Sequence, residues 1–502
     1  MTSPFFASKR NAWFGGSLLT CFLAVSSLSA ASDLQLFDAV RRQDIEAVRA
    51  LLDQKPDVNA RQGDGATALH WAAHRDDLDV AELLIGAGAD VNAANEYGVT
   101  ALALACTNQN EALVEKLLLA GADANLAQLS GVTPLMECSR TGSAAAVKLL
   151  LNRGASVDAR ESKSGQTALM WAASGGHSTA VKHLIDHKAD VRLRSKGGFT
   201  PLLFAARSGN VASARLLFEA GADANDSTEE YGSALVVAAA SGHEDLGVFL
   251  LEKGANPNAA DRNGITALHQ AARNGLEALT GVRYDPSYRI RPPNMPRLAK
   301  ALLARGANPN LQIAKNVSRG PDGSPFLMRG ATAYFLAAAS GDAMLMRILR
   351  EGGASATLTA EAGITPLMAA ARSACTGSCA FQGANEIDEA EAKAALEAVM
   401  AAVESGADVN TLNEDGQSAL HMAAFTGADG VVEYLASKGA KVDLTDKHGE
   451  TPWSMAAGIS PVLRYRGLYG KHESTAKLLE KLGAVPIGRD GMDEHAPAPP
   501  GQ

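Results

Sequence analysis

The chain has 502 residues, with 46 Lys and Arg against 55 Asp and Glu, a formal net charge of −9, and 46% hydrophobic but only 5% aromatic residues. The acidic balance argues against general binding to nucleic acid or to anionic lipid. The apolar fraction is enough for an elongated core in which alanine and leucine do most of the packing.

Residues 1–31 have the pattern of a secretory signal. Lys9 and Arg10 precede an uncharged run, and Ser29-Ala30-Ala31 supplies the small residues that a signal peptidase reads. We expect cleavage after Ala31, which removes two cations and no acids and changes the net charge from −9 to −11. Two alternatives stay open: an uncleaved membrane anchor, and a lipoprotein modified at Cys21. Export would place the chain in a bacterial periplasm or outside the cell, with no stable membrane insertion after cleavage.

Beyond the signal, a threonine-led phrase such as Thr67-Ala68-Leu69-His70-Trp71-Ala72-Ala73 recurs along the chain. Most neighbouring copies begin 33 residues apart, with one step of 34 and two longer steps. A self-similarity of this period indicates a stacked repeat architecture, in which no unit is stable alone. The phrases begin at Thr67, Thr100, Thr133, Thr167, Thr200, Ser233, Thr266, Thr332, Thr365, Ser418 and Thr451.

About twenty residues after each threonine, a leucine-rich stretch ends in Gly-Ala and a polar tail, as in Gly88-Ala89-Asp90-Val91-Asn92. With this second half of the unit, the sequence resembles the ankyrin repeat family from about Asp33 to about Ala484. The resemblance implies an all-α solenoid of about twelve helix-turn-helix units with β-turn fingers. Threonine suits the helix N-cap, and glycine after the last leucine suits the left-handed residue that ends a helix.

The predicted domains are therefore the signal at 1–31, one repeat solenoid at 32–484, and a proline- and glycine-rich disordered tail at 485–502. Insertions interrupt the solenoid at 276–296, 316–330, 375–387 and 459–472. The first, third and fourth fall between the two helices of a unit and should emerge along one edge. Two of them alternate arginine and tyrosine, residues that are enriched in binding hot spots. These are Arg283, Tyr284, Tyr288, Arg289 and Arg291 in the first, and Arg464, Tyr465 and Arg466 in the last. Padding is the alternative, because repeat arrays tolerate loop insertions at little cost.

The cysteines divide into two pairs after Cys21. Cys375 and Cys379 flank three residues within an insertion, and in an oxidising compartment we expect them to form a disulfide. Cys106 and Cys138 occupy small-residue positions of adjacent first helices. Because helix axes lie about 8 to 10 Å apart, we expect these two to be unbridged thiols that fill the core.

The concave face of the solenoid offers a second candidate surface, rival to the insertions. In ankyrin arrays the finger tips and the exposed side of the first helices commonly contact partners. Aromatic residues fall at both places, although each could instead pack on its neighbours, and the two tryptophans suit core packing. The candidates are Tyr97, Phe199 and Tyr231 at tips and Trp71, Trp171 and Phe204 on helices.

Sequence signatures of catalysis are missing: the chain has no P-loop, no Gly-x-Ser-x-Gly and no His-Glu-x-x-His motif. His183 and His187 stand four residues apart, a spacing that can hold a metal but that a solvated helix face explains as well. His70, His269 and His421 occupy the position at which the family uses histidine to bond the adjacent turn.

We therefore predict a monomeric, non-enzymatic scaffold that binds protein partners, with no catalytic residue, no metal and no cofactor. The alternative is an enzyme or ligand-binding accessory whose site is assembled from the arginine- and tyrosine-rich insertions.

Overall fold

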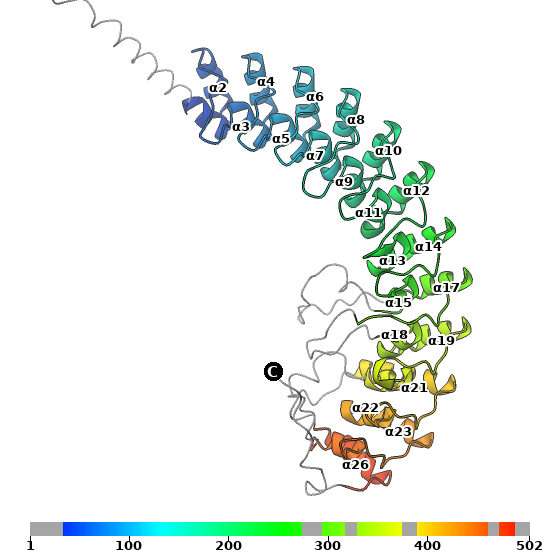
Figure 1. Cartoon of the computed structure of the whole chain (residues 1–502). Helices are drawn as coiled ribbons and strands as arrows, with labels where there is room; N and C mark the ends of the chain where they lie inside the picture. Colours follow the sequence, from blue (N-terminus) through cyan, green and yellow to red (C-terminus); the bar gives the residue numbers. More distant parts are fainter. Residues whose placement is uncertain (1–33, 274–293, 317–328, 374–388, 460–470, 487–502) are drawn as a thin grey trace, which may run out of the picture. The chain divides into compact units, whose positions relative to one another are not determined.

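The computed structural model describes residues 34–273, 294–316, 329–373, 389–459 and 471–486. The chain divides into two compact units, Met1–Pro201 and Leu202–Gln502. Within each unit, helical repeats follow one another in chain order, with the first helices of successive repeats in one row and the second helices in another (Figure 1). This confirms the predicted all-α repeat solenoid.

The first repeat begins with a helix at residues 34–41. The first helices of later repeats are α3 (Ala68–His74), α5 (Ala101–Thr107), α7 (Pro134–Thr141), α9 (Ala168–Ser174), α11 (Pro201–Ser208), α13 (Ala234–Ala240), α15 (Ala267–Ala271), α18 (Ala333–Ala339), α20 (Pro366–Arg372), α22 (Ala419–Thr426) and α24 (Pro452–Ala456). The second helices are α2 (Ile45–Leu52), α4 (Leu78–Gly86), α6 (Glu111–Leu119), α8 (Ala144–Asn152), α10 (Ser178–Asp186), α12 (Val211–Glu219), α14 (Glu244–Glu252), α17 (Pro296–Ala304), α19 (Ala343–Glu351), α21 (Glu389–Glu404), α23 (Asp429–Ser437) and α26 (Glu473–Lys481).

The recurring threonine begins the first helix, as predicted. In α5 the hydroxyl of Thr100 accepts a hydrogen bond from the Ala103 N–H at 3.2 Å, which satisfies one of the unpaired donors of the first turn. Proline occupies the first turn of α7, α20 and α24, where its missing N–H costs no helical bond. The helix start is thus encoded locally in every copy of the phrase.

From the second repeat on, a finger precedes the first helix, and in one repeat it forms the strand pair β1 (Ser227–Thr228) and β2 (Gly232–Ser233). In several fingers a side-chain acceptor holds the turn. Asn95, for example, accepts hydrogen bonds from the backbone N–H groups of Tyr97 and Val99 at 3.0 and 2.9 Å. A short 3₁₀ helix, η1 (Glu361–Gly363), replaces the open turn in one finger.

In seven of the repeats the polar tail ends in an asparagine that contacts the next repeat. Asn92 donates to the carbonyl of Gly121 at 3.1 Å and accepts from the N–H of Asp123 at 2.7 Å. The same pair of bonds recurs at Asn59, Asn125, Asn225, Asn258, Asn310 and Asn410. These asparagines link the backbones of successive repeats, a role that the sequence analysis did not assign to them.

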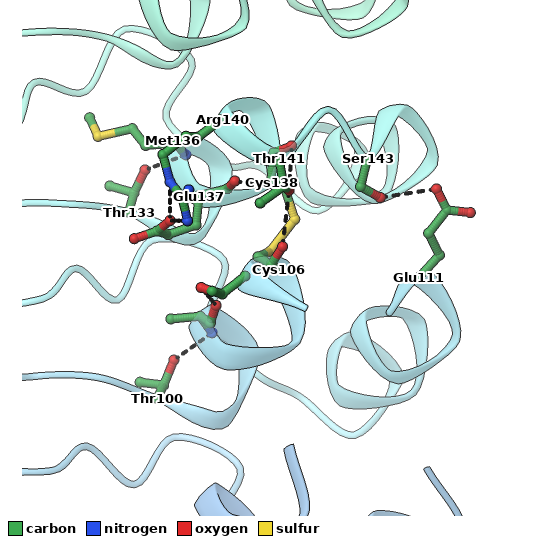
Figure 2. Close-up of a disulfide and its surroundings, with 12 residues drawn as sticks. Thr100, Cys106, Glu111, Thr133, Met136, Glu137, Cys138, Arg140, Thr141 and Ser143 are labelled. Atoms are coloured by element: carbon green, nitrogen blue, oxygen red, sulfur yellow. Dashed lines mark hydrogen bonds and ion pairs between the residues drawn. A yellow bond between two sulfur atoms is a disulfide. The ribbon is translucent and has the colours of Figure 1, made fainter. Parts of the chain in front are cut away.

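A disulfide joins Cys106 on α5 to Cys138 on α7, with the two Cα atoms 4.6 Å apart (Figure 2). The expectation that these cysteines are unbridged thiols was therefore wrong. It compared helix axes, which are about 8 to 10 Å apart, whereas each Cα lies about 2.3 Å from its own axis. Facing Cα atoms of two helices packed through small residues thus come within reach of a bridge. The other predicted pair, Cys375 and Cys379, lies outside the described residues.

Candidate protein-binding surface

The fingers of the first unit form a continuous edge. One backbone hydrogen bond joins each finger tip to the next, so the tips are held at a fixed spacing. The donors and acceptors are Glu96 N to Asp64 O at 3.0 Å, Leu129 N to Tyr97 O at 3.0 Å, Ser162 N to Ser130 O at 2.8 Å, and Lys196 N to Ser164 O at 2.8 Å.

Two tips on this edge carry exposed apolar side chains. Tyr97 is 66% exposed and Leu129 is 77% exposed, and the bond between their backbones places them on neighbouring fingers. Sequence reasoning selected Tyr97 and missed Leu129. The 33-residue period could have indicated that Leu129 is a tip residue, because it aligns Leu129 with Glu96, a charged residue at the tip of the preceding finger.

A second row of side chains lies on the first helices of the same unit. Trp71, Leu104, Glu137 and Trp171 occupy the same place in four successive threonine-led phrases, and all four are half-buried. Three of the four are apolar and one, Glu137, is charged. The row therefore carries two indole rings, a leucine and a carboxylate, each partly accessible.

Trp71 is fixed from three sides. Its indole N–H donates to Oε1 of Gln62 at 2.9 Å, the Arg41 guanidinium lies 4.3 Å from the ring centroid, and the His74 ring packs edge-on at 5.8 Å. The arginine contact adds a cation–π attraction of about 0.5 to 1 kcal/mol. The indole face is therefore held in one orientation by its own repeat and the preceding one.

Glu137 and Trp171 differ in how their polar atoms are satisfied. Glu137 pairs with Arg140 at 2.8 Å and accepts from Gln128 at 3.4 Å. The indole N–H of Trp171 is buried and finds no acceptor among the described residues. Both tryptophans are half-buried, so each ring packs partly on its own fold and is partly accessible.

The remaining predicted aromatic residues are less available. Phe204 is only 4% exposed, with the Arg207 guanidinium 5.4 Å from its ring centroid, so its ring belongs to the core. Phe199 and Tyr231 are half-buried. Tyr97 is the one predicted tip residue whose side chain is largely free of its own fold.

One finger of the edge is organised by a buried carboxylate. Burial raises the pKa of Glu161, but backbone hydrogen bonds from Gln166, Ser164 and Lys163 outweigh it and hold that pKa below its usual value. The charged form is therefore a structural part of the turn, and it is not a free acid for catalysis.

Histidines of the threonine-led phrase have a structural role, as the resemblance implied. Nδ1 of His70 accepts from the Thr67 N–H at 3.1 Å, and Nε2 donates to the carbonyl of Val99 at 2.9 Å. His269 and His421 make the same pair of bonds. Burial lowers the pKa of all three, that of His269 to about 4. They remain neutral at pH 7 and serve as bridges between a helix start and the next finger.

A second set of structural histidines went unnoticed in the sequence. Each begins a second helix and lies over a glycine of the preceding repeat. The ring of His177 lies against Gly142 and bonds the carbonyl of Arg140 at 3.0 Å. His243 lies over Gly209 in the same way, and His472 over Gly427. For the first two pairs the available signal was a glycine about 35 residues before the histidine, whereas an insertion separates Gly427 from His472.

Neither metal nor membrane signals emerge from the described part of the chain. His187 bonds the carbonyl of His183 at 2.8 Å and the side chain of Asn152 at 3.3 Å. No cluster of three or more His, Cys, Asp or Glu side chains that could hold a metal ion occurs within residues 34–486 outside the four gaps. In the same residues no helix combines the length and apolarity needed to cross a bilayer.

Three stretches outside the described residues, 274–293, 374–388 and 460–470, lie in the chain between the first and second helices of a repeat. Their flanking helices are α15 and α17, α20 and α21, and α24 and α26. A backbone hydrogen bond joins the residues that flank two of them: the Met295 N–H donates to Ala271 O at 2.9 Å, and the His472 N–H donates to Ala456 O at 2.8 Å. The proposed recognition residues themselves lie outside the described residues, namely Arg283, Tyr284, Tyr288, Arg289, Arg291, Arg464, Tyr465 and Arg466.

Comparison with known proteins agrees with this geometry. The family model "Ankyrin repeats (3 copies)" matches residues 36–128, 94–161, 108–195, 135–228 and 389–465, and "Ankyrin repeats (many copies)" matches 235–277. Serine/threonine-protein kinase 12 of Arabidopsis thaliana is 34% identical over 89 residues, 18% of this chain and 17% of that protein. The chain thus spans about a sixth of the length of this curated relative, and the kinase activity in its name is not transferred. The fold, the finger edge and the family matches together show that the chain belongs to the ankyrin repeat family.

Proposed function

We propose that the chain is a non-catalytic scaffold that binds a protein partner through the finger edge and first-helix row of its first unit. Ankyrin repeats generally mediate protein–protein interaction. The observation that carries the proposal is the pair of exposed apolar side chains, Tyr97 and Leu129, on two fingers joined by a 3.0 Å backbone bond. Large apolar side chains held at a fixed spacing favour the burial of a partner's apolar residues.

The test is affinity capture with the purified chain, followed by titration of the identified partner as a pure protein. Tyr97→Ser with Leu129→Ser should abolish saturable binding. Met344→Ser is the matched control, because Met344 is 59% exposed on α19 in the second unit. Equal binding by the double variant and the wild type would contradict the proposed surface.

We further propose that the scaffold acts after export, in a bacterial periplasm or outside the cell. The charge and residue pattern of 1–31 supports export, and so does a disulfide in the first unit, because such bonds persist mainly in oxidising compartments. Cell fractionation with N-terminal sequencing tests this. A mature chain that begins at Ser32 in the periplasm or medium is expected, and a full-length chain confined to the cytoplasm would contradict export.

A further inference from the structure

The Cys106–Cys138 disulfide crosses an interface between two repeats. The cysteines are 32 residues apart and come from the first helices of neighbouring repeats, so the bond joins two repeats and does not close a turn within one. Other bonds cross the same interface: Thr141 Oγ1 donates to Cys106 O at 3.0 Å, and Ser143 Oγ donates to Glu111 Oε1 at 2.9 Å (Figure 2). Bonds therefore link these two repeats both at their first helices and at their second helices.

The bridge lies wholly inside the stack. Cys106 and Cys138 are both 0% exposed. An external thiolate must approach a sulfur directly to exchange with the bond, and the packed helices leave no such approach. Formation and reduction of the bridge therefore both require the third and fourth repeats to separate.

We propose that the bridge closes while the repeats assemble and is then buried by their stacking, so that the third and fourth repeats separate far less readily than repeats without a bridge. In a linear array each repeat contacts only its neighbours, so separation at one interface is a low-cost route to local unfolding. The bridge makes that separation more costly at a single interface. It acts as a permanent cross-link, not as a redox switch, and this holds whether or not the proposed partner surface is correct.

The chemistry is a thiol–disulfide exchange with a disulfide donor, either an oxidised dithiol oxidoreductase or a small-molecule disulfide. One cysteine thiolate attacks the donor, forms a mixed disulfide and releases the first donor thiolate. The second cysteine then attacks the cysteine sulfur of that mixed disulfide and releases the second donor thiolate. Overall the two cysteines lose two electrons and two protons, and the donor disulfide becomes two thiols.

The neighbouring interface supplies an internal control. Ala73 and Ala105 stand 33 residues before Cys106 and Cys138, at the same places in the preceding pair of repeats. The finger bond Glu96 N to Asp64 O matches Leu129 N to Tyr97 O, and both are 3.0 Å. Replacing both cysteines by alanine therefore makes the bridged interface chemically like the unbridged one.

Two measurements test the proposal on the full chain. In the first, the oxidised protein is treated with dithiothreitol in native buffer and in urea, and peptide mass spectrometry follows alkylation at Cys106 and Cys138. We expect reduction to be at least about 100-fold slower in native buffer, because exchange must wait for opening. Equal rates in the two solutions would show that the bridge is open to reductants and would overturn the proposal.

In the second, hydrogen exchange compares the amides of Leu129 and Glu96. In the wild type the Leu129 amide should exchange at least about 10-fold more slowly than that of Glu96, and the Cys106→Ala, Cys138→Ala variant should bring the two rates together. A Leu129 rate that does not change in the variant would also overturn the proposal. Should the variant not fold, the reduction rates of the wild type still decide it.

Discussion

Acidification should weaken the second unit through His269, which is 2% exposed and lies between two repeats. Its Nδ1 accepts from the Thr266 N–H at 3.1 Å, so the ring proton lies on Nε2 and is donated to Leu311 O at 2.9 Å. A second proton would have to enter at Nδ1, against a backbone donor. Burial, which disfavours the imidazolium, lowers the pKa to about 4.

The sign and size of the effect follow from this pKa. Between pH 6.5, the ordinary value, and about 4, the unfolded chain binds a proton at His269 and the folded chain does not. The stabilising contribution is therefore complete above pH 6.5 and is lost as the pH falls toward 4. At about 1.4 kcal/mol per pH unit, the total loss is about 3 kcal/mol.

Urea unfolding followed by circular dichroism between pH 7 and pH 4 measures this loss, with His269→Gln as the perturbation. At pH 7 the variant should be less stable by about 1 to 3 kcal/mol, because a buried donor or acceptor loses its partner. Its stability should depend less on pH, so that the two proteins converge near pH 4. His448→Gln is the control, since that side chain is exposed. Parallel pH profiles for the wild type and His269→Gln would refute the assignment.

The other predictions concern contacts between repeats, and urea denaturation measures each of them. Asn92→Ala removes two inter-repeat bonds and should cost about 1 to 3 kcal/mol, whereas Asn92→Asp, which keeps the acceptor, should cost about half as much; equal costs would contradict the two-bond role. Gly142→Ala should cost about 2 to 4 kcal/mol, because the added Cβ would overlap the histidine ring of the next repeat. Gly154→Ala is the control, since Gly154 has a similar positive φ but open space around it, and it should cost about 1 to 2 kcal/mol. Trp171→Phe should change stability by less than about 0.5 kcal/mol, since no bond is lost, whereas Trp71→Phe should cost about 1 kcal/mol; the reverse order would argue against the bonding described for these two rings.

Much of the fold could be predicted because its signals are local and repeated. A threonine before alanine or proline marks a helix start through a bond that spans three residues, as Thr100 and Ala103 show. The 33-residue period then specifies which copies stack on one another. The histidine bridges could be assigned as well, since His70 stands at the same place in its phrase as His269 and His421.

The features that sequence reasoning missed depend on distances between side chains of different repeats. The bridge between Cys106 and Cys138 was rejected on a distance between helix axes, although the Cα atoms are the relevant points. Asn92 could be placed in a polar tail, but only coordinates show that its amide reaches Gly121 and Asp123. Leu129 drew no notice because an exposed leucine is ordinary unless its neighbour is also apolar and fixed beside it.

The asparagine contacts also bear on the order in which the repeats can form their bonds during synthesis. The side-chain amide of Asn92 meets backbone groups 29 and 31 residues further along the chain. During synthesis this amide stays bonded to water until the following repeat has emerged and folded against it. At the interfaces that carry such an asparagine, these two bonds can form only after the following repeat has been made.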